Sequence, residues 1–292
     1  MKAKVKCVLD IKAELGECPV WCARTSSLYW VDIYRPSLNC FTPATGKNHA
    51  WIFSEPIGSF ALSAGETVLV ALKSGLYRFD LATEALSVLA QPEPDLPSNR
   101  LNDGRCDRQG RFWVGSMRDP PDPARPTGSL YRFAQGQCTA MLGGLFVANG
   151  LAFSPDGRTL YNSDSFLSVR TIWAFDLDPD DGTIANRRVF VDTKGMPGRP
   201  DGGAVDADGC YWMAGNDGWE LVRFTPQGKV DRRIALPVAK PSMLAFGGDR
   251  LDVIYVTSIR PANADLSKQP LAGSLLAVEA GVTGLPEPLF AG

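Results

Sequence analysis

The chain has 292 residues, of which 45% are hydrophobic and 21% are charged, and its 30 basic and 32 acidic side chains give a net charge of −2. This length fits one large domain or two small ones. No Lys/Arg run suggests a nucleic-acid partner, and no apolar stretch reaches the roughly 18 residues of a membrane helix. Three of the first six residues are lysines and no apolar core follows them, so we expect a cytoplasmic protein.

Cysteine and histidine usage restricts the chemistry further. The seven cysteines are scattered and include no Cys-x-x-Cys pair, which favours reduced thiols over a disulfide framework or a zinc knuckle. The single histidine, His49, lies in a stretch that is typical of the start of a surface strand. A Ser-His-Asp triad would have to use it, and a His-rich zinc site is impossible. The chemistry must therefore use carboxylates, amides, arginines or a metal held by oxygen atoms.

Short alternating apolar runs, bounded by turns, predict β-strands along the whole chain. The clearest of these runs are 28–32, 67–71, 111–115, 211–214 and 253–257. Glycine and proline are spread evenly, and long apolar stripes of helical period are absent. We therefore expect an all-β protein.

A small or polar residue followed by a short apolar strand recurs six times. The copies begin at Glu17, Gly58, Asn102, Asn149, Asp201 and Ser242, with steps of 41, 44, 47, 52 and 41 residues. A second apolar element recurs in step with the first, at 37–41, 75–79, 129–133, 171–175, 220–224 and 274–278. Six such units predict a six-bladed β-propeller that spans residues 1–292 as one domain. Two β-sandwiches would not explain six copies in register.

Closure of the ring is expected to involve the two ends of the chain. The run 4–10 precedes the first repeat and the run 287–292 follows the last. We expect one of them to complete the blade of the other, which would remove a free sheet edge.

The repeat register predicts that the first residues of the six copies form one ring at the mouth of the central channel, because the first strand of each blade lines that channel. The ring would bring together two carboxylates, Glu17 and Asp201, and two amides, Asn102 and Asn149. Oxygen donors of these kinds suit a hard divalent cation, which would also relieve the repulsion between the carboxylates. A ring that only binds water is the alternative.

Two further segments are candidates for the channel mouth. Arg100 and Asn102 alternate along an extended segment, so both side chains could face the mouth. The arginine could then bind the oxygens of a polar substrate, or it could pair with a surface acid. The proline-rich stretch 117–128 is either a lid over the mouth or a stiff surface loop.

Several of these motifs together resemble the senescence marker protein/gluconolactonase family, also called regucalcin-like. The matching stretches are Gly16-Glu-Cys-Pro-Val-Trp21, Asn99-Arg-Leu-Asn-Asp-Gly104, Gly110-Arg-Phe-Trp-Val-Gly-Ser-Met117, Gly128-Ser-Leu-Tyr131, Asn149-Gly-Leu-Ala-Phe-Ser154 and Pro200-Asp-Gly-Gly203. The resemblance implies a six-bladed propeller with one catalytic divalent metal ion in the channel, either Ca²⁺, Zn²⁺, Mg²⁺, Mn²⁺ or Fe²⁺.

The resemblance also implies roles for particular residues. Metal ligands fall on Glu17, Asn149 and Asp201, and substrate contacts fall on Arg100 and Asn102. In the animal enzyme an acid on the lid also contacts the substrate. The stretch that matches it here reads Arg118-Asp-Pro-Pro121, and its prolines suggest a different fit to the substrate.

We therefore expect a metal-dependent lactonase that hydrolyses a five- or six-carbon aldonolactone to the aldonic acid. The metal would polarise the lactone carbonyl, and Asp201 would take a proton from the attacking water. Two alternatives stay open: a broader esterase or organophosphatase on the same fold, and a non-enzymatic calcium-binding or scaffold propeller. The expected partner is a small sugar lactone, and the expected assembly is a monomer or a weak dimer.

Overall fold

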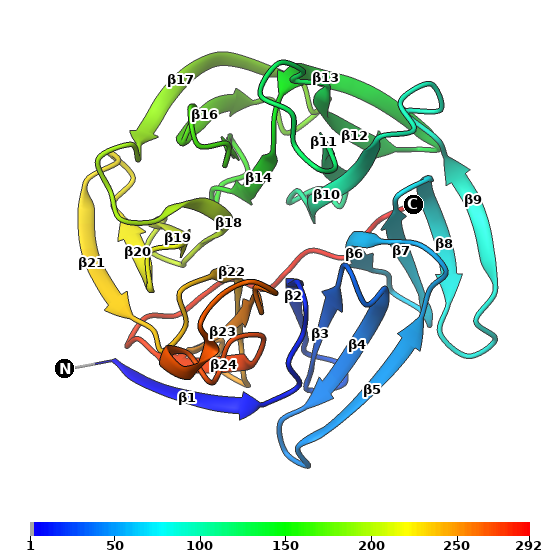
Figure 1. Cartoon of the computed structure of the whole chain (residues 1–292). Helices are drawn as coiled ribbons and strands as arrows, with labels where there is room; N and C mark the ends of the chain where they lie inside the picture. The colour runs from blue at the N-terminus through cyan, green and yellow to red at the C-terminus, as the bar shows by residue number, and fades with distance from the viewer. Residues whose placement is uncertain (1–2) are drawn as a thin grey trace.

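The computed structural model describes residues 3–292, which form six four-stranded sheets arranged around a central axis (Figure 1). Neighbouring strands within each sheet are antiparallel. The predicted six-bladed β-propeller is confirmed. Within the described range no helix is long and apolar enough to cross a membrane, and the one helical element is the 3₁₀ turn η1 (Leu266–Lys268).

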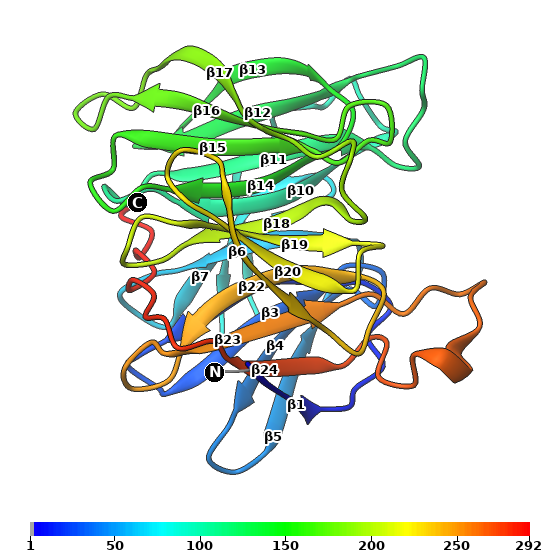
Figure 2. The same cartoon turned by 90° about the vertical axis from the view of Figure 1, so that its left-hand side faces the viewer.

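Each blade contributes one strand to each of four concentric layers, which Figure 2 shows from the side. The inner strands are β2 (Gly16–Cys22), β6 (Ile57–Leu62), β10 (Asn99–Cys106), β14 (Ala148–Phe153), β18 (Arg199–Val205) and β22 (Pro241–Gly247). The second strands are β3 (Ser27–Asp32), β7 (Thr67–Leu72), β11 (Phe112–Arg118), β15 (Thr159–Asp164), β19 (Tyr211–Asn216) and β23 (Val253–Ser258). The third strands are β4 (Ser37–Thr42), β8 (Gly75–Asp80), β12 (Gly128–Ala134), β16 (Thr171–Leu177), β20 (Glu220–Phe224) and β24 (Leu275–Glu279). The outer strands are β5 (Lys47–Ile52), β9 (Leu86–Ala90), β13 (Gln137–Leu145), β17 (Ile184–Asp192), β21 (Val230–Ala235) and β1 (Lys4–Leu9).

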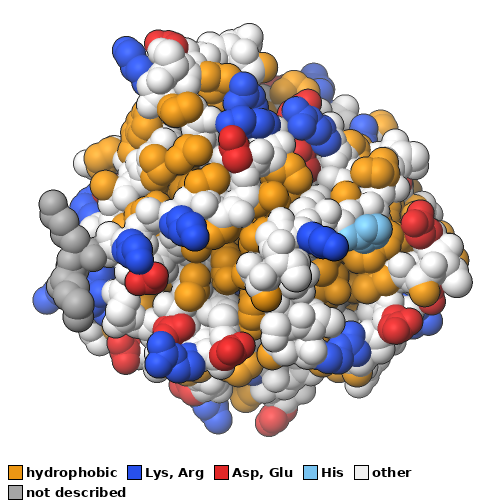
Figure 3. Space-filling model, turned by 90° about the horizontal axis from the view of Figure 1, so that it is seen from below, with side chains coloured by type: hydrophobic (Ala, Val, Ile, Leu, Met, Phe, Trp, Pro, Cys, Tyr) orange, Lys and Arg blue, Asp and Glu red, His pale blue; other side chains and the backbone are white. Residues whose placement is uncertain are grey.

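Burial decreases from the axis to the rim. Every residue of β2 and β10 is buried, whereas the outer strands β5 and β17 are mostly exposed. On the side wall shown in Figure 3, apolar side chains lie among charged side chains of both signs. The inner strands are thus held rigidly from both faces, which makes them suitable supports for a precise site.

The Asp-x-x-Gly turn after the inner strand anchors a tryptophan in two blades. The Gly110 amide donates to the Asp107 carbonyl to close the turn, and the buried Asp107 carboxylate accepts from Trp113 Nε1 at 2.9 Å. In the blade of β18–β21, Asp206 accepts from Trp212 Nε1 at 2.8 Å. The recurrence of this turn in the sequence therefore reflects one structural device that joins the inner strand to the second strand.

The N-terminal strand closes the ring. β1 pairs antiparallel with β24, so the last blade is built from both ends of the chain. This confirms that one end completes a blade that the other end begins. The run 287–292 joins no blade as a strand, and within it only Phe290 forms a single bridge, to Ser63.

The segment 280–292, here called the C-terminal strap, crosses the channel at the end where the inner strands finish (Figure 1). The Phe290 amide donates to the Leu62 carbonyl at 2.8 Å, and the Ala291 amide donates to the Gly110 carbonyl at 3.0 Å. The strap thus bonds to the ends of several blades and closes this end of the channel.

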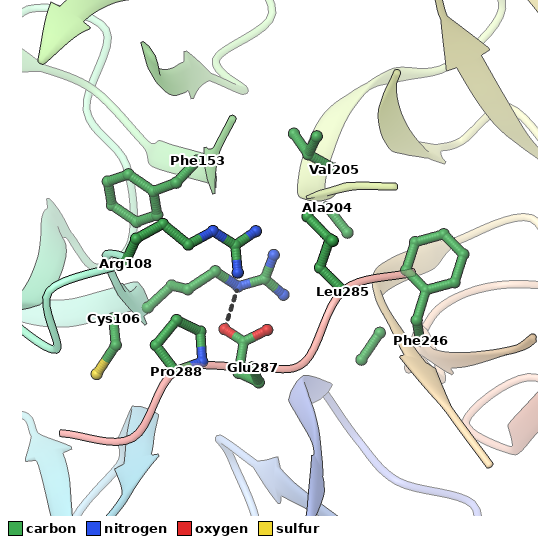
Figure 4. A pocket seen from close by; sticks show the side chains of 11 residues that line it. Cys106, Arg108, Phe153, Ala204, Val205, Phe246, Leu285, Glu287 and Pro288 are labelled. Atoms are coloured by element: carbon green, nitrogen blue, oxygen red, sulfur yellow. Dashed lines mark ion pairs between the residues drawn. The ribbon is translucent and has the colours of Figure 1, made fainter. Parts of the chain in front are cut away.

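A buried ion pair fixes the strap to the channel wall. Arg105 Nε lies 3.0 Å from Glu287 Oε1 (Figure 4), and the two side chains are only 7% and 22% exposed. A cavity of only about 20 Å³ is left beside them. The pair therefore sits where water has little access.

We predict that Glu287→Gln lowers the free energy of unfolding by about 2–4 kcal/mol, because it leaves the Arg105 guanidinium buried without a counter-charge. The matched control is Glu279→Gln, whose partner Lys4 is exposed, and which should change stability by less than about 1 kcal/mol. Urea unfolding followed by tryptophan fluorescence measures both variants. Equal midpoints for the two variants would contradict the role given to the pair.

Candidate active site

The open end of the channel holds a cavity of about 200 Å³, formed where the inner strands begin. All five residues singled out in the sequence line it: Glu17, Arg100, Asn102, Asn149 and Asp201. They come from β2, β10, β14 and β18. The structure therefore brings together, from four blades, the residues that the repeat register and the resemblance select.

Two of the six ring positions do not reach this cavity. Ser242 is buried; its hydroxyl donates to the Gly16 carbonyl of the neighbouring blade, and its Oγ lies 2.9 Å from Thr257 Oγ1. Gly58 carries no side chain, and a Cβ there would lie 2.3 Å from the Leu101 carbonyl oxygen. Its smallness lets β6 pack against β10. The ring of six that the register predicts is wrong at these two positions.

A break in strand register accompanies each site residue. The pairing of β2 with β3 shifts between Glu17 and Val20, and that of β14 with β15 shifts between Asn149 and Ala152. The other four inner strands shift at the same level. Such bulges redirect side chains and are common beside active sites. After Asn149 the chain turns at Gly150, whose φ is +64° and where a Cβ would lie 2.6 Å from a tyrosine hydroxyl.

Three buried carboxylates, those of Glu17, Asp103 and Asp201, lie close enough to repel one another. Burial raises the pKa of Glu17 well above its usual range, and the charges of Asp201 and Asp103 raise it further. Burial also raises the pKa of Asp201 and the pKa of Asp103, each to about 6. Without a metal ion, the hydrogen bonds within the site therefore do not compensate all of its negative charge.

Asp103 is a member of this group that the sequence reasoning did not select. Its Oδ2 accepts from the Leu151 amide at 2.8 Å, and its Oδ1 has no hydrogen-bond partner. Asp103 is adjacent to Asn102 in the sequence, which could have marked it. Side chains alternate along a regular strand, however, and that pattern would point the Asp103 side chain away from the cavity. The register shift between Leu101 and Gly104 changes that geometry.

The hydrogen bonds of Asn149 define the orientation of its amide. The Ser165 hydroxyl donates to the Pro200 carbonyl, which can only accept, so Ser165 Oγ accepts from Asn149 Nδ2 at 2.7 Å. Asn149 Oδ1 then accepts from Asn102 Nδ2 at 2.9 Å. This oxygen keeps a second lone pair for a ligand.

The two carboxylates that line the cavity are each held by one oxygen only. Asn216 Nδ2 donates to Asp201 Oδ2 at 2.6 Å, and the Cys18 amide donates to Glu17 Oε2 at 3.2 Å. Within the described chain, the other oxygen of each carboxylate has no hydrogen-bond donor. Asn216 and Ser165 were not predicted, because they follow or end second strands and carry no repeat signal.

These oxygens make a chemically suitable set for a hard divalent cation. Glu17, Asp201 and Asn149 would supply two carboxylate oxygens and one amide oxygen. Among residues 3–292, no group of three or more His, Cys, Asp or Glu side chains is placed to hold a metal by those types alone. The Asn149 amide is therefore essential to such a site. The unpartnered Asp103 oxygen and the raised carboxyl pKa values support the fit.

A second wall of the cavity is built around Arg100. Its side chain is only 4% exposed; its Nε donates to Asp119 Oδ2 at 2.7 Å and an Nη donates to Asn102 Oδ1 at 2.5 Å. Tyr34 donates to the same Asp119 carboxylate at 3.0 Å. Arg100 is thus paired with an acid, but the acid lies inside the cavity rather than on the surface. Asp119 and Pro121 also show that the stretch 117–128 reaches the cavity wall.

The single histidine lies away from this cavity. His49 is exposed on the outer strand β5, where its ring packs edge-on against Trp51 with 4.4 Å between centroids. The cavity therefore has no imidazole, and its acid–base groups are carboxylates.

A propeller with a carboxylate-rich cavity at one channel mouth matches a known group of proteins. Residues 15–260 match the family described as SMP-30/Gluconolactonase/LRE-like region. The chain is 40% identical to 6-deoxy-6-sulfogluconolactonase of Pseudomonas putida over 100% of both chains, and 37% identical to L-arabinolactonase of Azospirillum brasilense over 97% of this chain and 94% of the other. A crystal structure of the calcium-binding protein regucalcin from Agrobacterium tumefaciens matches with a TM-score of 0.94 at 28% identity, covering 99% and 98% of the two chains. The chain belongs to this family, and it is a gluconolactonase-like hydrolase.

We predict that a divalent cation stabilises the protein more at about pH 7.5 than at about pH 5.5. Because folding raises these carboxyl pKa values, the metal-free folded state binds more protons than the unfolded chain, and its stability falls as the pH rises through about 6. A bound cation replaces those protons. The increase in Tm on adding Ca²⁺ or Mn²⁺ to chelator-treated protein, measured at both pH values, tests this.

Glu17→Gln supplies the matched variant. In chelator at about pH 7.5 it should unfold a few degrees above the wild type, because one of the repelling charges is gone. With saturating cation, the wild type should instead unfold at the higher temperature. Glu66→Gln, an exposed site, serves as the control. If Glu17→Gln and the wild type respond equally to cation, Glu17 is not a ligand.

Proposed function

We propose that the protein is a divalent-metal-dependent sugar lactonase, which hydrolyses a five- or six-carbon aldonolactone to the aldonic acid. The observation that carries this proposal is the convergence of Glu17, Asn149 and Asp201 oxygens in one cavity with Arg100 and Asn102. The names of two relatives, a sulfogluconolactonase and an arabinolactonase, support the same class of substrate.

In this proposal Glu17, Asn149 and Asp201 hold the cation, which would polarise the lactone carbonyl as a Lewis acid when it is bound. Asp201 also acts as general base. As a metal ligand its carboxylate would be ionised, and an ionised carboxylate can take a proton from water. Asn216 donates to Asp201 Oδ2 and so holds the carboxylate in place for both roles.

The bond changes and proton transfers of the hydrolysis follow from these roles. Water attacks the carbonyl carbon and gives a proton to Asp201, the bond between the carbonyl carbon and the ring oxygen breaks, and the departing oxygen takes up a proton. Arg100 and Asn102 orient the sugar hydroxyls or the ring oxygen by hydrogen bonds. Asp119 and Tyr34 hold the Arg100 side chain in place for this task.

The polar walls favour a sugar over an aryl ester. Arg100, Asn102 and Asn149 offer donors and acceptors that hydroxyl groups can use, whereas an aryl group would leave them unpaired. We further propose a cytoplasmic location and action without a permanent partner chain. All seven cysteines are free, which fits a reducing compartment.

The direct test is release of acid from gluconolactone, galactonolactone, xylonolactone and arabinonolactone, followed with a pH indicator after subtraction of the spontaneous rate. Protein stripped with chelator should be inactive and should recover with a single divalent metal. A flat trace with every metal would contradict the lactonase assignment. Aryl esters and phosphotriesters, run in the same plate, detect the broader esterase instead.

Asp201→Asn should lower kcat/KM by about 10³-fold or more while the propeller still folds, because it removes both the base and a charged ligand. Asp176→Asn, at an exposed ion pair on the β16–β17 hairpin, is the control and should keep wild-type activity. Circular dichroism confirms folding of both variants. Wild-type turnover by a folded Asp201→Asn protein would exclude Asp201 as the base.

A further inference from the structure

Two basic side chains meet beside the cavity, and one of them, Arg199, lines it. Arg199, at the start of β18, lines the cavity, and its Nε lies 3.3 Å from Asp217 Oδ2. Lys240, directly before β22, forms an ion pair with the same Asp217 carboxylate. Arg199 and Lys240 also each lie 3.4 Å from Asn216 Oδ1. Two cations therefore share one carboxylate, which is itself 47% exposed.

The other charges around the cavity do not compensate this excess. Arg100 and Asp119 neutralise each other through a 2.7 Å contact. Glu17 and Asp201 belong to the proposed cation site. Arg199 and Lys240 also attract the Asp201 carboxylate, but a bound cation would compensate that negative charge. In the described chain, Asp217 is the only acid within ion-pair distance of Arg199 or Lys240. With the cation bound, this side of the cavity would carry one positive charge in excess of Asp217.

Arg199 also has hydrogen-bonding capacity to spare. Its Nε is buried against Asp217 and makes no hydrogen bond, so the Nη groups of this partly exposed side chain are the donors that a ligand could reach. Its one side-chain hydrogen bond is the long contact with Asn216. A guanidinium with unused donors is well suited to binding an oxyanion through two parallel bonds.

We propose that Arg199 and Lys240 form a specificity site for an anionic group on the lactone carbon farthest from the carbonyl. This inference rests on the proposed function and narrows its substrate class to six-carbon lactones with a sulfonate, phosphate or carboxylate at carbon 6. Arg199 and Asp201 are two residues apart on one strand, a separation of about 6.6 Å, which is comparable with the length of such a lactone. The name of one relative places a sulfo group on carbon 6.

The test compares kcat/KM for gluconolactone with kcat/KM for its 6-sulfo and 6-phospho analogues and for glucarolactone, which carries a carboxylate at carbon 6. We expect the best anionic lactone to be preferred by about 10- to 100-fold, the effect of one or two charge-assisted hydrogen bonds. The three anionic substrates distinguish sulfonate, phosphate and carboxylate. The preference should also decrease with added salt.

Arg199→Met and Lys240→Met should each reduce the preference for the anionic lactone by about tenfold, mainly through KM. Arg158→Met, which removes an exposed positive charge beside the turn after β14, should leave the preference unchanged. If Arg199→Met weakened turnover of the neutral and the anionic lactones equally, Arg199 would act only through Asp201, and the inference would be wrong.

The wild-type protein provides a readout that does not depend on whether the variants fold. In calorimetric titrations, glucarate should bind about tenfold more tightly than gluconate, because only glucarate has a charged group at carbon 6. Equal affinities, or equal kcat/KM for anionic and neutral lactones, would overturn the specificity site and leave the lactonase proposal standing. Failure to open any lactone would overturn the lactonase proposal itself.

Discussion

The burial of carboxylates at the mouth of the channel is the constraint around which the rest of the site is arranged. Glu17, Asp103 and Asp201 are each less than 8% exposed and repel one another. A flexible scaffold would relax by turning one of them toward water. Here they project from inner strands that are buried on both faces, so the repulsion persists in the folded protein. We expect such a site to be unstable alone and to gain stability from a bound cation, which would couple folding to metal binding.

The rest of the propeller maintains this arrangement. The register shifts in the inner strands direct the ligands toward the channel, and side chains from neighbouring strands restrain the parts of the ligands that do not face it. The C-terminal strap closes the far end of the channel and places the Arg105–Glu287 ion pair there. The cavity at the opposite end is open to substrate and water, and a low local dielectric strengthens the charge interactions inside it.

Much of this could be predicted from the sequence, because the repeats carry both the fold and the register. Four of the six ring positions reach the cavity, and the two that do not are explained by what they contact. Ser242 bonds to Gly16 and Thr257, and Gly58 allows close packing of two inner strands. The position of the C-terminal strap could not be predicted, since its bonds join blades far apart in sequence.

The repeat pattern also could not predict the residues that support the site. Asn216 and Ser165 lie at or just after the ends of second strands, where no periodicity marks them, and their roles depend on the direction of single hydrogen bonds. The role of Asp103 could not be predicted because a bulge reverses the alternation of side chains expected of a regular strand. In each case a correct prediction would have required the three-dimensional geometry of one or two residues.

The central claim is that Glu17, Asn149 and Asp201 together bind one divalent cation. Anomalous diffraction from crystals grown with Mn²⁺ tests it most directly, because it locates the ion without reference to activity. The account predicts one strong anomalous peak within coordination distance of an oxygen from each of the three side chains. An empty site in crystals grown with excess Mn²⁺, or a peak elsewhere while these three side chains bond only to protein groups, would contradict it.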